Sequence, residues 1–223
     1  MTIQEMHQLF RVVGQQMGMQ TIRAILPEEI DVFLNMAINE KINEVLASNV
    51  LSDTSKVLTG NAKIGNLNFF RTLQKKGDAN LSELNDDTEN ISIATFSVKD
   101  VMLITGIYVH YGSEDTVSKK YYECRLMGVD EVNNAINDYC NSPSYNYPIA
   151  SINSQTDNVL ELTIYRGNKV PGNIVVNYIK SPDIVSFENS VNCDLPDYAH
   201  NEIVQLAVQK YFNSVGSTTH NVE

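Results

Sequence analysis

The tripeptide His200-Asn201-Glu202 matches the first half of a zinc-deaminase motif. In such enzymes the histidine binds zinc and the glutamate transfers protons, while a P-C-x-x-C sequence supplies the other zinc ligands. The chain contains no P-C-x-x-C sequence, so the tripeptide predicts no metal site. We expect His200 in the first turn of the last helix, in a capping or solvent-facing role.

Cysteine chemistry would require a basic neighbour or a partner thiol. The chain has three cysteines, Cys124, Cys140 and Cys193, and no C-x-x-C spacing, which predicts neither a disulfide framework nor a zinc site. A thiol nucleophile needs a base, and His110 lies on a predicted strand near that of Cys124. Buried, unreactive cysteine is the safer interpretation, because free cysteine is among the most buried residue types.

Glycine and acidic patterns give two further candidates. The stretch GNAKIGN at 60–66 has the G-x-x-x-x-G spacing of a phosphate-binding loop. It lacks the following Lys and Ser/Thr, and no predicted strand precedes it. The acidic pairs Asp86-Asp87 and Glu114-Asp115 fall in predicted turns, where solvation explains them better than acid–base catalysis. The sequence therefore predicts no catalytic residue, no cofactor and no metal, and a chain that is not an enzyme.

The net charge of −11 argues against a protein that grips nucleic acid through its phosphates. Such proteins need clustered Lys and Arg, whereas the longest basic runs here are Lys75-Lys76 and Lys119-Lys120. An acidic wall can still face DNA that passes by without specific binding. No signal peptide and no stretch of roughly 18 apolar residues is found, so we expect assembly in a reducing cytoplasm and no membrane partner.

Three amphipathic segments predict helices near the two ends of the chain. Residues 2–18 begin with Thr2 and Glu5 at the spacing of a capping box. Residues 27–48 carry one wide apolar stripe. Residues 197–213 show only a narrow polar line, so this helix must be covered on more than one side. We expect the last two helices to share a core formed by Ile30, Leu34, Ile38, Val204, Ala207 and Tyr211.

Residues 52–90 are polar and contain several glycines, which predicts a long, mostly irregular segment with at most one or two helical turns. Its one strongly apolar patch is the stretch LNFF at 67–70. An ordered loop of this length needs a surface to lie against, either on a neighbouring chain or on its own domain. We interpret this patch and two aromatic residues of the last helix as a partner interface: Leu67, Phe69, Phe70, Tyr211 and Phe212.

The segment from 91 to 182 is rich in β-branched and aromatic residues, which predicts strands. A short helix is expected at 128–143, with Asp130 as its cap and Pro143 as its stop. The predicted strands cover residues 91–98, 101–112, 119–127, 147–153, 158–167 and 173–182.

The order of these elements predicts an α+β fold, in which the N- and C-terminal helices form a helical bundle and the β-rich segment is an insertion. The expected parts are N-terminal helices at 1–51, a long loop at 52–90, the β-rich insertion at 91–182, and a C-terminal helix with a polar tail at 183–223.

Three stretches carry a resemblance to a known family. They are NIVVNYIKSP followed by CDLPDYAHNEIVQLAVQKYF within 173–212, ILPEEIDVFLNMAINEKINEVL at 25–46, and VDEVNNAINDYCNSPSYNYPIASI at 129–152. The sequence here resembles head–tail adaptor (connector) proteins of short-tailed phages, in particular the crAss-like group. The resemblance implies a helical bundle with a β-rich insert, repeated around a closed, dodecameric ring in the neck of the virion. The implied partners are other copies of the chain, the portal protein, downstream tail or ring proteins, and passing DNA.

Two alternatives stay open at this point. The chain could be a docking module of the virion for a tail fibre or a decoration protein, in which case the β-rich part would present an exposed edge or patch. It could also be a small hydrolase whose site has no linear motif, which a pocket with converging titratable groups would favour. A native mass of many chains would favour the ring.

Overall fold

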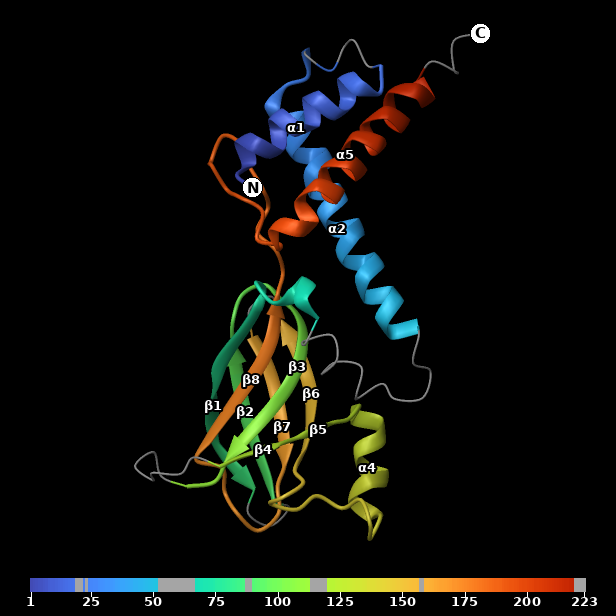
Figure 1. The fold of residues 1–223 in the computed structure, drawn as a ribbon. Helices are drawn as coiled ribbons and strands as arrows, with labels where there is room; N and C mark the ends of the chain where they lie inside the picture. Colours follow the sequence, from blue (N-terminus) through green and yellow to red (C-terminus); the bar gives the residue numbers. More distant parts are fainter. Residues whose placement is uncertain are drawn as a thin grey trace. The chain divides into compact units, whose positions relative to one another are not determined.

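The structure, a computed structural model, divides into two compact units (Figure 1). The helical unit contains residues 1–54, 67–73 and 182–223, and the sheet unit contains residues 55–66 and 74–181. The residues that the structure describes are 1–18, 22, 24–51, 67–86, 90–112, 120–156 and 159–218.

Helix α1 (Ile3–Gln16) begins at the predicted capping box. The Thr2 hydroxyl accepts the Glu5 N–H at 3.3 Å, and the Glu5 carboxylate accepts the Thr2 N–H at 2.8 Å. Two of the four N–H groups that a helix start leaves without a partner are satisfied in this way. The prediction from the Thr2 and Glu5 spacing is confirmed.

Helices α2 (Pro27–Leu51) and α5 (Asp197–Thr218) pack against each other and against α1. Tyr211 is half-buried, with its ring centroid 5.4 Å from that of Phe33 and 6.1 Å from that of Phe10. The predicted shared core is confirmed, although α5 continues past the predicted end at residue 213. The other predicted core residues are fully buried: Ile30, Leu34, Ile38, Val204 and Ala207.

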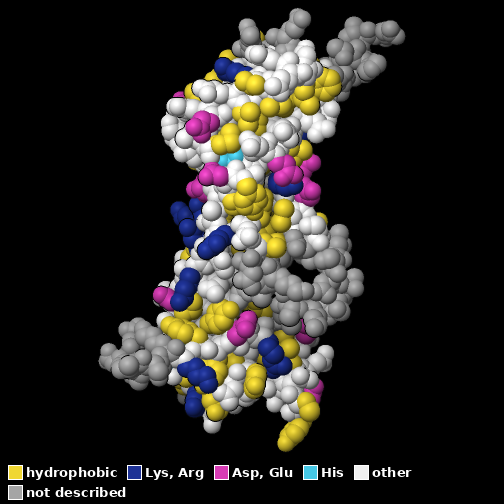
Figure 2. Space-filling model, viewed as in Figure 1, with side chains coloured by type: hydrophobic (Ala, Val, Ile, Leu, Met, Phe, Trp, Pro, Cys, Tyr) yellow, Lys and Arg dark blue, Asp and Glu magenta, His cyan; other side chains and the backbone are white. Residues whose placement is uncertain are grey.

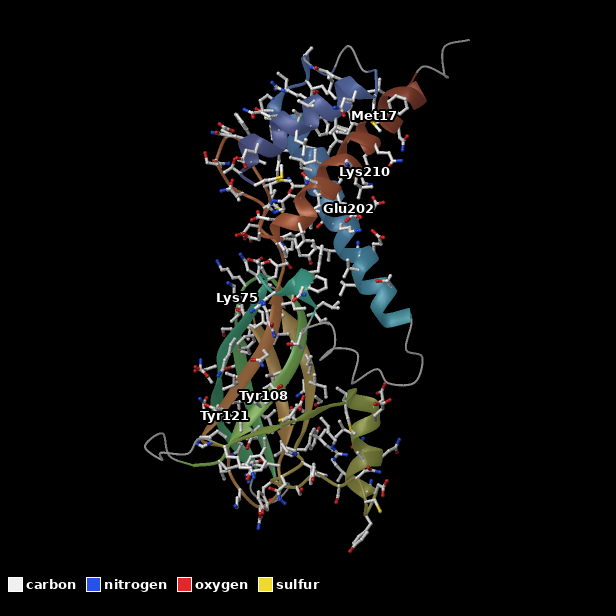
Figure 3. All side chains as sticks on the ribbon, in the orientation of Figure 1. Met17, Lys75, Tyr108, Tyr121, Glu202 and Lys210 are labelled. Carbon is white, nitrogen blue, oxygen red and sulfur yellow. The ribbon has the colours of Figure 1, made fainter. Side chains whose placement is uncertain are left out.

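Ion pairs also join α2 to α5 at the surface. Lys41 donates to Glu202 at 2.5 Å, and Lys210 pairs with Glu40; Glu202 and Lys210 are labelled on α5 in Figure 3. The hydrogen bond that Lys41 donates to Glu202 is the main reason why the pKa of Lys41 is raised. Surface pairs of this kind each contribute only about 0–1 kcal/mol, so the buried core carries most of the packing energy.

The segment before α5 is tied to α2 by two polar side chains. Asn35 donates to the Val185 carbonyl at 3.0 Å and accepts the Val185 N–H at 3.0 Å. Asp31 accepts the Phe187 N–H at 2.8 Å. These bonds satisfy backbone groups that lie outside any helix or strand.

The sheet unit is built on one eight-stranded sheet, in the order β4-β3-β8-β1-β2-β7-β6-β5. Its core contains Phe96, Ile107, Leu162, Ile164 and Val176 among other apolar residues. The strands are β1 (Gln74–Asp86), β2 (Ile91–Ser97), β3 (Val101–His110), β4 (Tyr121–Glu123), β5 (Arg125–Leu126), β6 (Ile149–Thr156), β7 (Val159–Tyr165) and β8 (Asn173–Lys180).

One short segment joins the two edges of this sheet. Strand β4 pairs antiparallel with β3, and β5, which follows one residue later, pairs parallel with β6. Between them, the Cys124 N–H donates to the Ile107 carbonyl at 2.8 Å, and the Arg125 N–H donates to the Pro148 carbonyl at 2.9 Å. The predicted strand 119–127 is thus two strands, and it nearly closes the sheet into a barrel.

Strand β1 corrects the expectation of an irregular segment over 52–90. Residues 74–86 form a strand that pairs with β8 on one side and with β2 on the other. The patch at 67–70 contains the short 3-10 helix η2 (Asn68–Phe70), and residues 52–66 lie outside the described residues. The polar sequence of β1 is compatible with a central strand because both neighbouring strands satisfy its backbone.

The predicted helix at 128–143 is α4 (Val129–Asn137), which is shorter than expected. Its cap is Gly128, whose backbone is extended, and Asp130 instead lies in the first turn. The prediction that Asp130 caps this helix was therefore wrong. An acidic residue in the first turn still interacts favourably with the helix dipole.

The predicted fold class was also wrong. The chain is a mixed α/β protein whose larger core belongs to the eight-stranded sheet, with four α-helices among the described residues. The helical bundle was overestimated because β1 was read as a loop and the closing segment as a single strand. None of the described helices is both long enough and apolar enough to cross a membrane.

Candidate binding site around Arg125

The segment that joins the sheet edges presents alternate side chains to the two faces of the sheet. Cys124 belongs to the sheet core and Leu126 packs against it. Because successive side chains of a strand point to opposite faces, Tyr121, Glu123 and Arg125 are placed on the outer face. The closure of the sheet therefore fixes the backbone of Arg125 at the surface of the unit.

Arg125 has fewer partners than its five N–H donors allow. One guanidinium nitrogen, Nη2, donates to the Asn141 carbonyl at 2.6 Å. The Nε atom is buried and has no hydrogen-bond partner in the described part of the chain. A buried donor without a partner costs about 1–3 kcal/mol, so this side chain favours a ligand that supplies an acceptor.

The loop after α4 holds the Asn141 carbonyl in place. The Asp138 carboxylate accepts the Cys140 N–H at 2.9 Å and the Asn141 side-chain amide at 2.5 Å. These hydrogen bonds, with that from Asn141 first, lower the pKa of Asp138. Asp138 thus holds the turn whose Asn141 carbonyl accepts the hydrogen bond from Arg125.

Two pockets meet at Arg125. One has a volume of about 410 Å³ and is also lined by Thr105, Tyr121, Glu123 and Tyr147. The other has a volume of about 390 Å³ and is lined by Tyr139, Cys140, Ser142, Ser144 and Tyr147 in addition to Arg125. Arg125 and Tyr147 are common to both, so they form the ridge between two neighbouring hollows.

Tyrosine and lysine side chains surround this ridge. Tyr139 is 96% exposed and Tyr147 is 67% exposed. The ammonium of Lys76 lies 5.4 Å from the ring centroid of Tyr121; Tyr108 and Tyr121 are labelled on the sheet unit in Figure 3. On the face shown in Figure 2, most Lys and Arg side chains lie over the sheet unit.

A second group of tyrosines is packed together with tilted and edge-to-face rings. The ring centroids of Tyr111, Tyr122 and Tyr145 lie 5.7–6.5 Å from one another. Lys120 lies 4.8 Å from the Tyr122 ring centroid, and Lys169 lies 4.1 Å from that of Tyr145. These cation–π contacts hold positive charge beside the aromatic rings.

Exposed tyrosines around an incompletely paired arginine suit recognition of a polypeptide. Tyr and Arg are the residues that most often dominate binding energy in protein interfaces. Arg also presents a planar fork that matches a carboxylate. Cys140 lines the smaller pocket, but no histidine is among the residues that line either pocket. The arrangement can bind an acidic group.

The residues considered for chemistry that the structure describes include Cys124, His110 and His200. Burial raises the pKa of the Cys124 thiol, which disfavours the thiolate. Nδ1 of His110 bonds the Lys120 carbonyl at 3.0 Å. His200 is buried rather than solvent-facing, and its Nε2 bonds the Leu195 carbonyl at 2.8 Å. No metal-binding cluster occurs among the described residues.

The residues predicted as a partner interface lie in the helical unit. Phe69 and Phe70 are buried and meet edge to face, with ring centroids 5.1 Å apart. Leu67 and Tyr211 are half-buried, and Phe212 is 52% exposed. Their role as an interface stays a prediction.

Other predicted sites fall where the structure gives no description. The glycine stretch at 60–66, Asp87, and the pair Glu114-Asp115 lie outside the described residues.

The Arg125 site was not predicted, although the sequence contains one signal for it. Seven of the eleven tyrosines lie between residues 108 and 147. A concentration of tyrosine beside an arginine is typical of recognition surfaces. The grouping around Arg125 depends on the closure of the sheet and on the turn at Asp138, which no local pattern predicts.

Comparison with protein-family models gives no match for this chain. Comparison with curated proteins gives no match either.

Proposed function

We propose that this chain is a non-enzymatic structural protein of a phage virion, a head–tail adaptor that forms a closed ring between the portal protein and the tail. In this proposal the surface around Arg125 contacts a neighbouring copy of the chain. The observation that carries it is the Arg125 guanidinium, which has one backbone partner and lies between two open pockets beside exposed tyrosines.

A ring requires two different surfaces on each subunit, because its contacts are heterologous. The two units differ in net charge. The helical unit has five Lys and Arg against thirteen Asp and Glu, a net charge of −8, and the sheet unit has eleven against fourteen, a net charge of −3. Acidic side chains of a neighbouring helical unit would complement the cations beside the tyrosines, which are Arg125, Lys76, Lys120 and Lys169.

Exposed apolar side chains on the helical unit support the same proposal. Val32 and Met36 lie one turn apart on α2 and are 56% and 48% exposed. Leu26, just before this helix, is 59% exposed, and Phe212 near the end of α5 is 52% exposed. Burial of such side chains contributes roughly 25 cal/mol per Å², which would add to the polar contacts of an interface.

The excess of acidic residues also suits a channel wall for passing DNA. A surface that repels phosphates lets DNA move along it without binding. The proposed ring would thus guide the DNA and leave sequence-specific contacts to other proteins.

The native mass of the purified full chain, alone and with the portal protein, tests the proposal. The expected mass is a closed multiple of the 25.0 kDa subunit, formed alone or on the portal. A chain that remains a monomer under both conditions would overturn the ring. Electron microscopy of the virion should place the protein at the neck, and its absence there would overturn the adaptor.

Variants of Arg125 test the contact itself. Arg125→Ala should weaken subunit association by about 30-fold or more, the effect of losing an interface residue worth 2 kcal/mol. Arg125→Lys keeps the charge but loses the planar fork, so it should restore association only in part. Lys99→Ala removes an exposed charge elsewhere on the sheet unit and is the matched control. Equal association of all four proteins would remove Arg125 from the interface.

The same surface also fits a docking module for a tail-fibre or decoration protein, because exposed tyrosine and arginine suit a different polypeptide equally well. The native mass distinguishes the two functions. A docking module would be a monomer that binds one virion protein through Arg125, whereas the adaptor would form a ring of its own copies.

A further inference from the structure

A further pocket lies in the helical unit. It has a volume of about 260 Å³ and is lined by Gln4, His7, Gln8 and Arg11 of α1 and by Phe187. The four α1 residues follow i, i+3, i+4, i+7 spacing, which places them on one face of the helix. One helix face therefore supplies nearly all of the polar groups.

The contact with Asp31 fixes which nitrogen carries the hydrogen in a neutral His7 ring. Oδ2 of the Asp31 carboxylate accepts the Phe187 N–H at 2.8 Å, and Oδ1 lies 2.7 Å from His7 Nε2. An ionised carboxylate can only accept hydrogen bonds, so Nε2 carries a proton. In the neutral ring Nδ1 is then a bare acceptor. His7 is only 4% exposed, and its Nδ1 is buried without a hydrogen-bond partner among the described residues.

Arg11 supplies the opposite polarity in the same pocket. Its Nε–H is a donor, and this atom too is buried without a partner in the described part of the chain. Its Nη2 makes one long hydrogen bond, 3.5 Å, to the Ile25 carbonyl. With the His7 ring in its neutral form, the described residues of the pocket thus combine an unmatched acceptor, His7 Nδ1, with an unmatched donor, Arg11 Nε–H.

We propose that this pocket binds the amide group of a polypeptide partner. An amide offers a carbonyl oxygen for Arg11 Nε–H and, on a separate atom, an N–H for His7 Nδ1. The Gln4 and Gln8 carboxamides can bond it from the rim, and the Phe187 ring, stacked on His7 at 4.8 Å, forms an apolar wall.

An anionic ligand fits these groups less well. A carboxylate would satisfy Arg11, but its oxygens would face the His7 Nδ1 acceptor without a proton between them. The helical unit also carries a net charge of −8, which repels anions. The volume is slightly below the 300–1,000 Å³ of typical small-molecule pockets, so one side chain or peptide group is the appropriate size of occupant.

The test compares acetamide with acetate, which has the same shape and lacks the N–H donors. The full chain, labelled with ¹⁵N in histidine and arginine side chains, is titrated with each and followed by NMR. Acetamide should give saturable shifts of His7 Nδ1 and Arg11 Nε, and acetate should bind about three- to tenfold more weakly, the effect of losing one hydrogen bond. The amide of the partner could belong to its main chain or to an Asn or Gln side chain, and N-methylacetamide distinguishes these. Binding tighter than that of acetamide indicates a main-chain amide, and weaker binding indicates an Asn or Gln side chain.

Two substitutions complete the design. Arg11→Met keeps the length of the side chain but removes the donor, and should weaken acetamide binding by about three- to tenfold. Arg71→Met makes the same change at an exposed arginine outside the pocket and should leave binding unchanged. The proposal is overturned if acetate binds as tightly as acetamide, if neither gives a saturable shift, or if Arg11→Met binds like the original chain. This test does not depend on the proposed ring, since it is carried out on the isolated chain.

Discussion

Replacement of Gly77 by alanine should destabilise the sheet unit, because the ring of Phe96 already occupies the space for a side chain. An ideal Cβ atom at Gly77 would lie 2.8 Å from Cε2 and 3.1 Å from Cζ of Phe96. Phe96 is fully buried, and its ring meets that of Tyr178 edge to face at 5.4 Å. The ring therefore has little room to move away from a new methyl group.

The size of the effect follows from two opposing contributions. Overpacking a core costs about 1–3 kcal/mol, while Gly→Ala restricts the unfolded chain and gains about 0.4–1 kcal/mol. Gly77→Ala should thus lower the free energy of unfolding by about 0–2.6 kcal/mol. In a Phe96→Leu background the clash is absent, and the same substitution should be stabilising by about 0.4–1 kcal/mol.

Denaturant unfolding followed by tyrosine fluorescence measures this double-mutant cycle. The chain has no tryptophan, and nine of its eleven tyrosines lie in the sheet unit, so the signal reports mainly on that unit. The expected coupling between Gly77 and Phe96 is about 1–3 kcal/mol, within the range for residues in contact. A stabilising Gly77→Ala in the original chain, or additivity within about 0.5 kcal/mol, would refute the packing argument.

Four further outcomes are expected. Leu34→Ala, at a fully buried site in the helical unit, should cost about 2–5 kcal/mol; circular dichroism of helix unfolding measures this, and a change below about 0.5 kcal/mol would contradict the shared core. Phe70→Ala should cost about 3–5 kcal/mol because Phe70 is fully buried; a stable monomer with weakened assembly would instead assign Phe70 to an interface, as its sequence context predicts. Burial lowers the pKa of His200 below its ordinary value of 6.5, so the unfolded chain takes up this proton at a higher pH than the folded chain. The stability present above pH 6.5 should therefore decrease as the pH falls toward the lowered pKa. The slope of the unfolding free energy against pH should be smaller in His200→Gln, and an unchanged slope would exclude this residue. DNA binding by the isolated chain should be weak at physiological salt, and a titration showing a loss of about 10³–10⁵ in affinity between 50 and 200 mM salt would contradict the channel wall.

The helices of the chain were predictable because their signals are local. The capping box at Thr2 and Glu5 involves residues within one turn. The apolar stripes that include Leu34 and Val204 repeat with the period of a helix. Strands such as β2 and β8 were predictable for a similar reason, since they are rich in β-branched residues that suit a pleated sheet.

Strand β1 was missed because its sequence, QKKGDANLSELND, is poor in β-formers. Its position in the middle of the sheet depends on pairing with β2, which follows it directly, and with β8, which is distant in the sequence. Gly77 weakens the propensity further, yet it is the residue that makes room for Phe96. In this strand the tertiary packing requires the very residue that argues against a strand locally.

The Arg125 site could not be predicted for a related reason, since the same few residues close the sheet and create the site. Its backbone N–H is bonded to the Pro148 carbonyl, and its guanidinium is bonded to the Asn141 carbonyl, so the loop after α4 holds it at two points. A side chain held in this way loses little further freedom when a partner arrives, which reduces the entropic cost of association. In the proposed interface, the closed sheet therefore fixes the position of Arg125 before a partner is present.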